Sequence, residues 1–163
     1  MRKLSTERAQ IIKHVLDLNF IKQGGRLKSV PLYGKLKQAN DGYVYLDVSN
    51  NFINGIFPLI RDEGIEKPPY FQGKYQRIGA HVSVVSSEEA DMFEDIEEIG
   101  EEFSFKLGSL KSVEPERWPD MDRVWFVQIE SSELKQLRRK YGLPQKLNGH
   151  EFHITVACKR KGN

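Results

Sequence analysis

The sequence predicts an α+β domain with largely antiparallel strands, and three observations lead to this prediction. The chain has 163 residues, of which 39% are hydrophobic and 29% charged, a composition ordinary for a globular protein. Segments with the alternation of strands are interspersed with segments that have the spacing of amphipathic helices. Their order does not repeat the strand–helix–strand unit of a parallel sheet, and no linker-like tract divides the chain. We therefore expect a single domain over residues 1–163, with an element count that suits two small lobes.

The first half of the chain is expected to hold two helices and two strands. Residues 6–18 have the apolar spacing of an amphipathic helix. Residues 43–49 alternate as a half-buried strand, and residues 50–62 then look helical, although an internal proline weakens that prediction. A loop rich in Pro, Tyr and Gly over residues 66–75 leads into a second strand at residues 78–85.

A third helix is expected after the second strand, because Ser86 and Glu89 have the spacing of a capping box. Its inner face would consist of Met92, Phe93, Ile96 and Ile99. Nine carboxylates and no basic residue occur in residues 88–102. We interpret this acidic run as a helix face in water, not as a metal or partner site.

The remaining elements are three strands and one helix. Alternation predicts strands at residues 103–107 and 124–130. Ser131 or Ser132 then caps a short helix that runs through Tyr141, and Asn148-Gly149 turns the chain into a last strand at residues 151–158.

Composition also limits the setting and the partners. No apolar run reaches the roughly 18 residues of a membrane span, so we expect neither a membrane segment nor a secretory signal. The single cysteine, Cys158, excludes an internal disulfide and a zinc site with several thiolates, which favours a cytoplasmic protein. Residues 1–37 carry a net charge of +7 and residues 132–163 a net charge of +6. If these ends meet, they form a positive surface suited to a phosphate-bearing partner; scattered solvated lysines are the alternative.

Two histidines occur in matching strand-like contexts 72 residues apart. The first triplet is His81-Val82-Ser83 and the second is His153-Ile154-Thr155. Because residues i and i+2 of a strand share a face, each imidazole would project beside a hydroxyl while its apolar neighbours enter the core. One such strand is ordinary, but two copies indicate a shared chemical role.

Other candidates for substrate contact are weaker. Arg77 has the strand parity of His81 and would reach a phosphate if the strand extends that far; a solvated arginine is the alternative. Tyr70, Tyr75 and Tyr33 would stack on a base, or else cover the core, and Phe71 has the same standing as Tyr70. We expect no metal site, because a histidine at position 150 would point away from His153 on a strand.

The paired triplets resemble the signature of the two-histidine (2H) phosphoesterases, and their surroundings resemble the Swiss-army-knife, RNA-repair-like branch of that superfamily. The resembling segments are Gly42-Tyr43-Val44-Tyr45-Leu46-Asp47, Phe52-Ile53, Lys67-Pro68-Pro69-Tyr70-Phe71 and Gly79-Ala80-His81-Val82-Ser83-Val84. The resemblance covers residues 40–158, whereas residues 1–39, with the N-terminal helix and basic segment, carry no motif. It implies a bilobal, pseudo-twofold fold of two small, mostly antiparallel sheets with outer helices and a central cleft.

The resemblance also implies an activity. This is the opening of a cyclic phosphodiester, usually a 2′,3′-cyclic phosphate on RNA or a nucleotide, without metal or cofactor. His81 and His153 would be the general acid and base, and Ser83 and Thr155 would bind the phosphate, with serine standing where many members have threonine. A neutral-range pKa suits histidine to both tasks, because in-line attack needs a base on the entering oxygen and an acid on the leaving one. We expect a monomer that acts on RNA or a nucleotide with a cyclic or 2′-linked phosphate.

Three alternatives remain open. A non-catalytic module would use the same cleft to bind RNA or a nucleotide, although such a module would more often have lost a histidine. RNA-end ligation would reverse the same chemistry. A structural or interaction protein would carry the two triplets by coincidence and would have no phosphate affinity.

Overall fold

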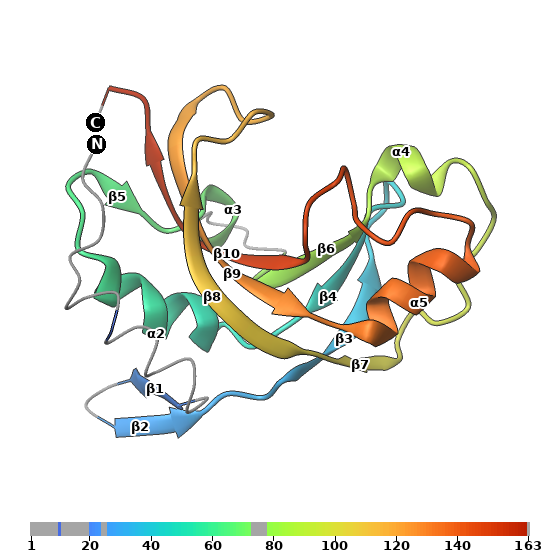
Figure 1. The fold of residues 1–163 in the computed structure, drawn as a ribbon, viewed down its shortest axis with the longest axis horizontal. Helices are drawn as coiled ribbons and strands as arrows, with labels where there is room; N and C mark the ends of the chain where they lie inside the picture. The colour runs from blue at the N-terminus through green and yellow to red at the C-terminus, as the bar shows by residue number, and fades with distance from the viewer. Residues whose placement is uncertain (1–9, 11–19, 24–25, 73–77, 163) are drawn as a thin grey trace.

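The computed structural model describes residues 10, 20–23, 26–72 and 78–162, and Figure 1 shows how their elements are arranged. Seven strands form a continuous sheet in the order β7-β3-β4-β6-β10-β9-β8, and β5 joins it by pairing with β10. The strands β1 and β2 form a separate two-stranded sheet. Neighbouring strands pair antiparallel throughout the part of the chain that the structure describes. The predicted α+β class with mostly antiparallel strands is therefore confirmed.

The elements of the described residues have the following bounds. The strands are β1 Phe20–Gln23, β2 Arg26–Ser29, β3 Tyr33–Gln38, β4 Val44–Asp47, β5 Ile65–Glu66, β6 His81–Val85, β7 Glu102–Ser104, β8 Lys106–Val113, β9 Met121–Glu130 and β10 His153–Arg160. The helices are α2 Asn51–Ile60, α3 Pro69–Gln72, α4 Ser87–Ala90 and α5 Ser132–Lys140.

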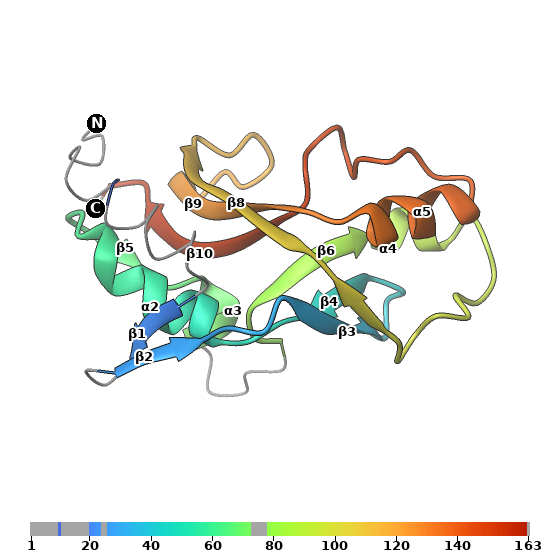
Figure 2. The ribbon, with the colours of Figure 1, turned by 60° about the horizontal axis from the view of Figure 1, so that its bottom comes forward.

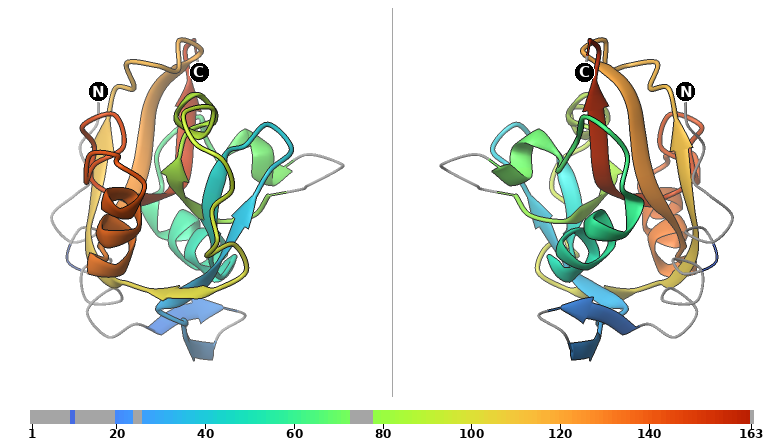
Figure 3. Two further views of the ribbon diagram at one scale, coloured as in Figure 1. Left: turned by 90° about the vertical axis from the view of Figure 1, so that its right-hand side faces the viewer. Right: turned by 90° about the vertical axis from the view of Figure 1, so that its left-hand side faces the viewer.

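The large sheet is strongly bent, and the short connection between its two edge strands requires the bend. Strands β7 and β8 lie at opposite ends of the strand order, yet only Phe105 separates them in sequence. In a flat sheet, strands spaced about 4.8 Å apart would put these two edges about 29 Å from each other. One residue cannot span that distance, so the edges approach each other at this end. Figure 3 shows the result, with β3 and β4 on one side of the bend and β8 and β9 on the other.

The core lies between one face of the sheet and the apolar sides of α2 and α5. These helices lie at opposite ends of the sheet (Figures 1 and 2). Helix α2 contributes Phe52, Ile53 and Ile56, each fully buried, and α5 contributes Leu134. Helix α5 starts where predicted, because the Ser131 hydroxyl accepts the Leu134 N–H and donates to the Ser104 carbonyl. The core is completed by the faces of β6 and β10 that carry Val82 and Ile154, the central residues of the two triplets.

The predicted helix over the acidic run is wrong beyond its first turn. The capping box of Ser86 and Glu89 is present, but α4 ends at Ala90. Met92, expected on the inner face, is 75% exposed, whereas Ile96 is buried. Carboxylates three and four residues apart would face one another on a helix with no cation between them, which destabilises it. The acidic face is not uniformly solvated either, because Glu89 is paired with the fully buried Arg138.

Several other elements differ from the sequence predictions. Strands β1 to β3 were not expected, and the single strand predicted at residues 103–107 is divided between β7 and β8. The helix predicted at residues 6–18 lies outside the described residues, apart from residue 10. The division into two lobes related by a pseudo-twofold axis stays a prediction, because the two halves of the large sheet are joined through β6 and β10. Among the helices of the described residues, none has the length and apolarity needed to cross a membrane.

The positive surface predicted from the chain ends is not free at the C-terminal end. Five of the eight basic residues in 132–163 form ion pairs within the chain. These residues are Arg138, Lys140, Lys146, Lys159 and Arg160. Four of these pairs bring in carboxylates from outside residues 132–163, which offset part of the net charge of +6, and the fifth, Lys146–Glu151, lies within the segment. Most of the N-terminal basic segment lies outside the described residues.

Candidate active site

The two histidine triplets lie next to each other in the middle of the sheet. Strands β6 and β10 are antiparallel neighbours, and Val82 faces Ile154 across them. One step to either side of this pair places His81 opposite Thr155 and Ser83 opposite His153. The central Val82 and Ile154 are fully buried, whereas the histidines and hydroxyl residues are half-buried on the other face. The register therefore relates the two triplets by a local twofold and brings all four polar side chains to one face.

Both imidazoles are held in the same way by their own strand. The Nδ1 atom of His81 lies 2.8 Å from the Gly79 carbonyl oxygen, and that of His153 lies 2.9 Å from the Glu151 carbonyl oxygen. A carbonyl only accepts, so each Nδ1 carries the proton and donates. In the neutral ring Nε2 is then a free base, and in the charged ring Nε2 is an acid. Each histidine is thus oriented to exchange protons through Nε2.

The surroundings of His81 act on its charge in opposite directions. Burial lowers its pKa below the usual 6.5, whereas the hydrogen bond to the Gly79 carbonyl and the charge of Asp47 raise it. Asp47 lies directly opposite His81 on β4, and its carboxylate is 2.8 Å from Lys37 Nζ. A charge on His153 lowers the pKa of His81 further, so the two imidazoles are electrostatically coupled.

Among the described residues, no carboxylate raises the pKa of His153 as Asp47 raises that of His81. Burial lowers its pKa, the hydrogen bond to the Glu151 carbonyl raises it, and the charge of His150 lowers it. On its other side lies the ring of Phe126 from β9, whose centroid is 4.9 Å from that of His153. The two histidines therefore share an orientation but have different neighbours.

Three tyrosines surround His81. The Tyr70 ring from α3 lies edge-on at a centroid distance of 4.9 Å, and the rings of Tyr45 and Tyr43 lie at 5.7 Å and 6.2 Å. Tyr43 and Tyr45 also stack on each other at 5.7 Å. These contacts fix the imidazole from the side of β4 and α3.

Two of these tyrosines also contact the hydroxyls of the triplets. The Tyr43 hydroxyl is hydrogen-bonded to the Ser83 hydroxyl, and the Tyr70 phenol lies close enough to the Thr155 hydroxyl for that group to lower its pKa. Burial is the larger effect and raises the pKa of both phenols, although Ser83 and Thr155 act in the opposite direction. Both phenols therefore keep their protons near neutral pH.

The other residues predicted to contact substrate are distributed differently. Tyr33 lies on β3, two strands away from His81, with 51% of its surface exposed. Phe71 packs against the core, beneath the Lys67 ammonium. Arg77 and Tyr75 lie outside the described residues, and the predicted central cleft stays a prediction.

The sequence interpretation did not include Tyr43, Tyr45, Asp47 and Phe126 in the site. The first three alternate on one face of a predicted strand, and this alternation was visible in the sequence. Their role was not visible, because nothing local says that β4 lies beside β6. Phe126 gave no signal, since an aromatic residue in a strand is usually part of the core.

Among the described residues, no group of three or more His, Cys, Asp or Glu side chains lies together as metal ligands would. His150 is exposed, and Cys158 is fully buried near the other end of β10. Burial raises the pKa of the Cys158 thiol to about 11, and the thiol donates to the Lys67 carbonyl. Cys158 is thus a structural thiol.

Comparison with known proteins identifies the family. The family model for the Swiss Army Knife 2H phosphoesterase domain matches residues 44–163, a segment that contains both triplets and two of the three tyrosines around His81. No curated protein and no solved structure shows a significant match to the chain. The matched segment covers well over half of the sequence, and the chain therefore belongs to the Swiss Army Knife family of 2H phosphoesterases.

Proposed function

We propose that this protein is a phosphodiesterase that opens a cyclic or 2′-linked phosphodiester of RNA or a nucleotide without the help of a metal. His81 and His153 act as the general acid and base. One observation carries this proposal: the two triplets lie side by side on β6 and β10, and each imidazole donates through Nδ1 to its own strand. Nε2 of each ring is thereby left to take or give a proton.

The separation of the two rings suits an in-line displacement. His81 and His153 are diagonal neighbours across the strands, which corresponds to about 7–8 Å between their Cα atoms. A phosphate between them has one imidazole on its entering side and the other on its leaving side. The basic imidazole takes a proton from water as the water oxygen bonds to phosphorus. The bond from phosphorus to the ester oxygen breaks, and the other imidazole gives that oxygen its proton.

The coupled protonation of His81 and His153 supports the assignment of one ring as the acid and the other as the base. Since a charge on His153 lowers the pKa of His81, the doubly protonated pair is disfavoured. Acid–base catalysis requires the form in which one imidazole carries a proton and the other is neutral; because burial lowers the pKa of both rings, this form is most populated below pH 6.5. The roles of the two rings exchange when the reaction runs in the opposite direction.

Ser83 and Thr155 complete the proposed site as phosphate ligands. Each lies opposite one histidine and on the same face, so their hydroxyls flank the space between the rings. A hydroxyl that donates to a non-bridging oxygen stabilises the charge that builds up in the transition state.

The test is turnover of a small substrate panel in EDTA. The panel contains nucleoside 2′,3′-cyclic phosphates, 2′,5′-linked adenylates and an RNA that ends in a cyclic phosphate, with a His81→Gln/His153→Gln double variant as the control for contaminating activity. We expect hydrolysis of at least one substrate by the wild type in chelator and none by the variant. Binding of a substrate without turnover would contradict the proposal and favour the non-catalytic module. Turnover that EDTA abolishes and added metal restores would contradict the metal-independent mechanism.

A further inference from the structure

Each hydroxyl of the two triplets has its own tyrosine partner. Tyr43, directly before β4, is hydrogen-bonded to Ser83. Tyr70, on α3, lies with its ring 4.9 Å from that of His81, and the Thr155 hydroxyl is close enough to lower the pKa of its phenol. The two tyrosines come from separate elements that approach the triplets independently. A phenol thus lies beside each triplet hydroxyl, and in the Tyr43 pair the hydrogen bond is formed.

The chemistry of these pairs sets the direction of the hydrogen bonds. Burial raises the pKa of Tyr43 and of Tyr70, so each phenol has a proton to donate at neutral pH. A phenol is a stronger acid than an aliphatic hydroxyl and is the better donor in such a pair. When the phenol donates, the proton of Ser83 or Thr155 is free to point elsewhere. If the serine or threonine hydroxyl donated to the phenol instead, its lone pairs would point toward a bound anion.

We propose that Tyr43 and Tyr70 are positioning residues that donate to Ser83 and Thr155 and thereby turn the protons of these hydroxyls toward the substrate phosphate. This proposal rests on the proposed function, since it assumes that the triplets hold a phosphate. Each chain from phenol to hydroxyl to phosphate oxygen aligns its dipoles, and each hydrogen bond strengthens the next one. The tyrosines act through the motif hydroxyls and need no contact with the substrate.

Tyr141 offers a control outside the site. Its hydroxyl donates to the Glu98 carboxylate and accepts the Glu97 N–H, and its ring packs against Phe93 just after α5. Tyr141→Phe removes a phenol that makes hydrogen bonds of its own but belongs to neither triplet. Loss of the Tyr141 hydroxyl should therefore leave phosphate binding unchanged.

The experiment is a pair of double-mutant cycles in kcat/KM on the substrate that the panel identifies. One cycle combines Tyr43→Phe with Ser83→Ala, and the other combines Tyr70→Phe with Thr155→Val. We expect each Tyr→Phe change alone to lower kcat/KM roughly three- to tenfold, the effect of one hydrogen bond. In each cycle the double variant should be no slower than the serine or threonine variant alone, because the tyrosine acts only through that hydroxyl.

Two controls separate positioning from structure. Tyr141→Phe should stay within about twofold of the wild type. The crossed double variant Tyr43→Phe/Thr155→Val should show the product of its two single effects. Multiplicative effects within the native pairs, or an unchanged rate in both Tyr→Phe variants, would overturn the proposal. If Tyr43→Phe does not fold, as circular dichroism would reveal, the Tyr70 cycle decides alone.

The same cycles measured on the affinity for inorganic phosphate, by calorimetry, distinguish this proposal from the proposed function. Coupled effects of each native pair on phosphate affinity in a protein without turnover would support the tyrosine proposal while the proposed function fails. Turnover by the wild type with uncoupled effects would overturn the tyrosine proposal and leave the proposed function in place.

Discussion

The most severe single change away from the histidines is expected at Arg138, which joins the ends of both triplet strands. Its guanidinium donates to both carboxylate oxygens of Glu89, at 2.9 Å and 2.7 Å, and to the Val84 carbonyl at 2.7 Å. It also donates to the carbonyls of Pro144 and Lys146 at 2.6 Å and 3.3 Å. The contacts with Val84 and Glu89 hold the C-terminal end of β6 and the turn after it. The contacts with the carbonyls of residues 144 and 146 hold the segment that leads to β10.

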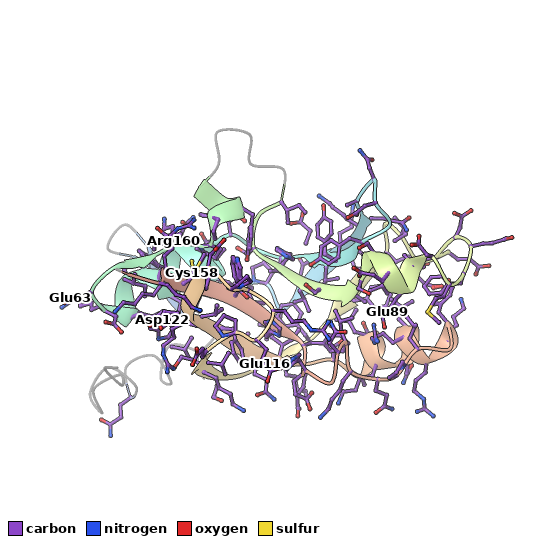
Figure 4. All side chains as sticks on the ribbon, turned by 90° about the horizontal axis from the view of Figure 1, so that it is seen from above. Glu63, Glu89, Glu116, Asp122, Cys158 and Arg160 are labelled. Carbon is purple, nitrogen blue, oxygen red and sulfur yellow. The ribbon has the colours of Figure 1, made fainter. Side chains whose placement is uncertain are left out.

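The magnitude follows from what Arg138→Met would leave behind. The Arg138 side chain is fully buried, and Figure 4 shows Glu89 at the end of the molecule where α4 and α5 lie. Removal of the guanidinium strands the Glu89 carboxylate, whose side chain is only 19% exposed, and leaves three carbonyls without this donor. Breaking a buried ion pair from one side typically costs about 3–5 kcal/mol of the free energy of unfolding.

Urea unfolding followed by circular dichroism measures this loss. Arg139→Met on the same helix is the matched control, because Arg139 is exposed and its substitution should change the free energy of unfolding by no more than about 0.5 kcal/mol. A loss below about 1 kcal/mol for Arg138→Met, at an unchanged urea dependence, would refute the reasoning that Arg138 links the two strands.

Three further predictions concern the imidazole pair. Burial lowers the pKa of both His81 and His153 below 6.5, so kcat/KM should follow a bell whose two limbs both lie below 6.5; an optimum above pH 8 would contradict this. Asp47→Asn removes the charge that raises the pKa of His81, and at least one limb should therefore move to lower pH, whereas an unchanged profile would show that Asp47 does not act on the pair. Gly79→Ala would place a Cβ against the side-chain oxygen of Asn50. This oxygen accepts a hydrogen bond from the backbone N–H of Ala80. Because the Gly79 carbonyl holds His81, we expect a loss of kcat/KM of about tenfold or more, and a wild-type rate would refute this orienting role.

The faces of the triplet strands were predictable because they depend on local alternation. His81 and Ser83 alternate with residues that are fully buried, and so do His153 and Thr155. Each strand must bury one face, and the sequence shows which one. The caps at Ser86 and Ser131 were predictable for the same reason, since each lies within three residues of the group that it binds.

The neighbours of the triplets were not predictable, because they come from distant segments. Forty residues separate Tyr43 from Ser83, and their contact exists only because β4 pairs with β6. Glu89 illustrates the same limit. Its place in a capping box was visible in the sequence, but its ion pair with Arg138, 49 residues later, was not. The acidic run around it was therefore interpreted as a solvated helix face.

The central claim is that two imidazoles carry the acid and the base, and single substitutions test it most directly. We would measure kcat/KM in EDTA for His81→Gln, His153→Gln and His150→Gln, the last being an exposed histidine three residues from His153. We expect a loss of about 10²–10⁴-fold in each of the first two variants and a change within about twofold in the third. A wild-type rate in either His81→Gln or His153→Gln would contradict it.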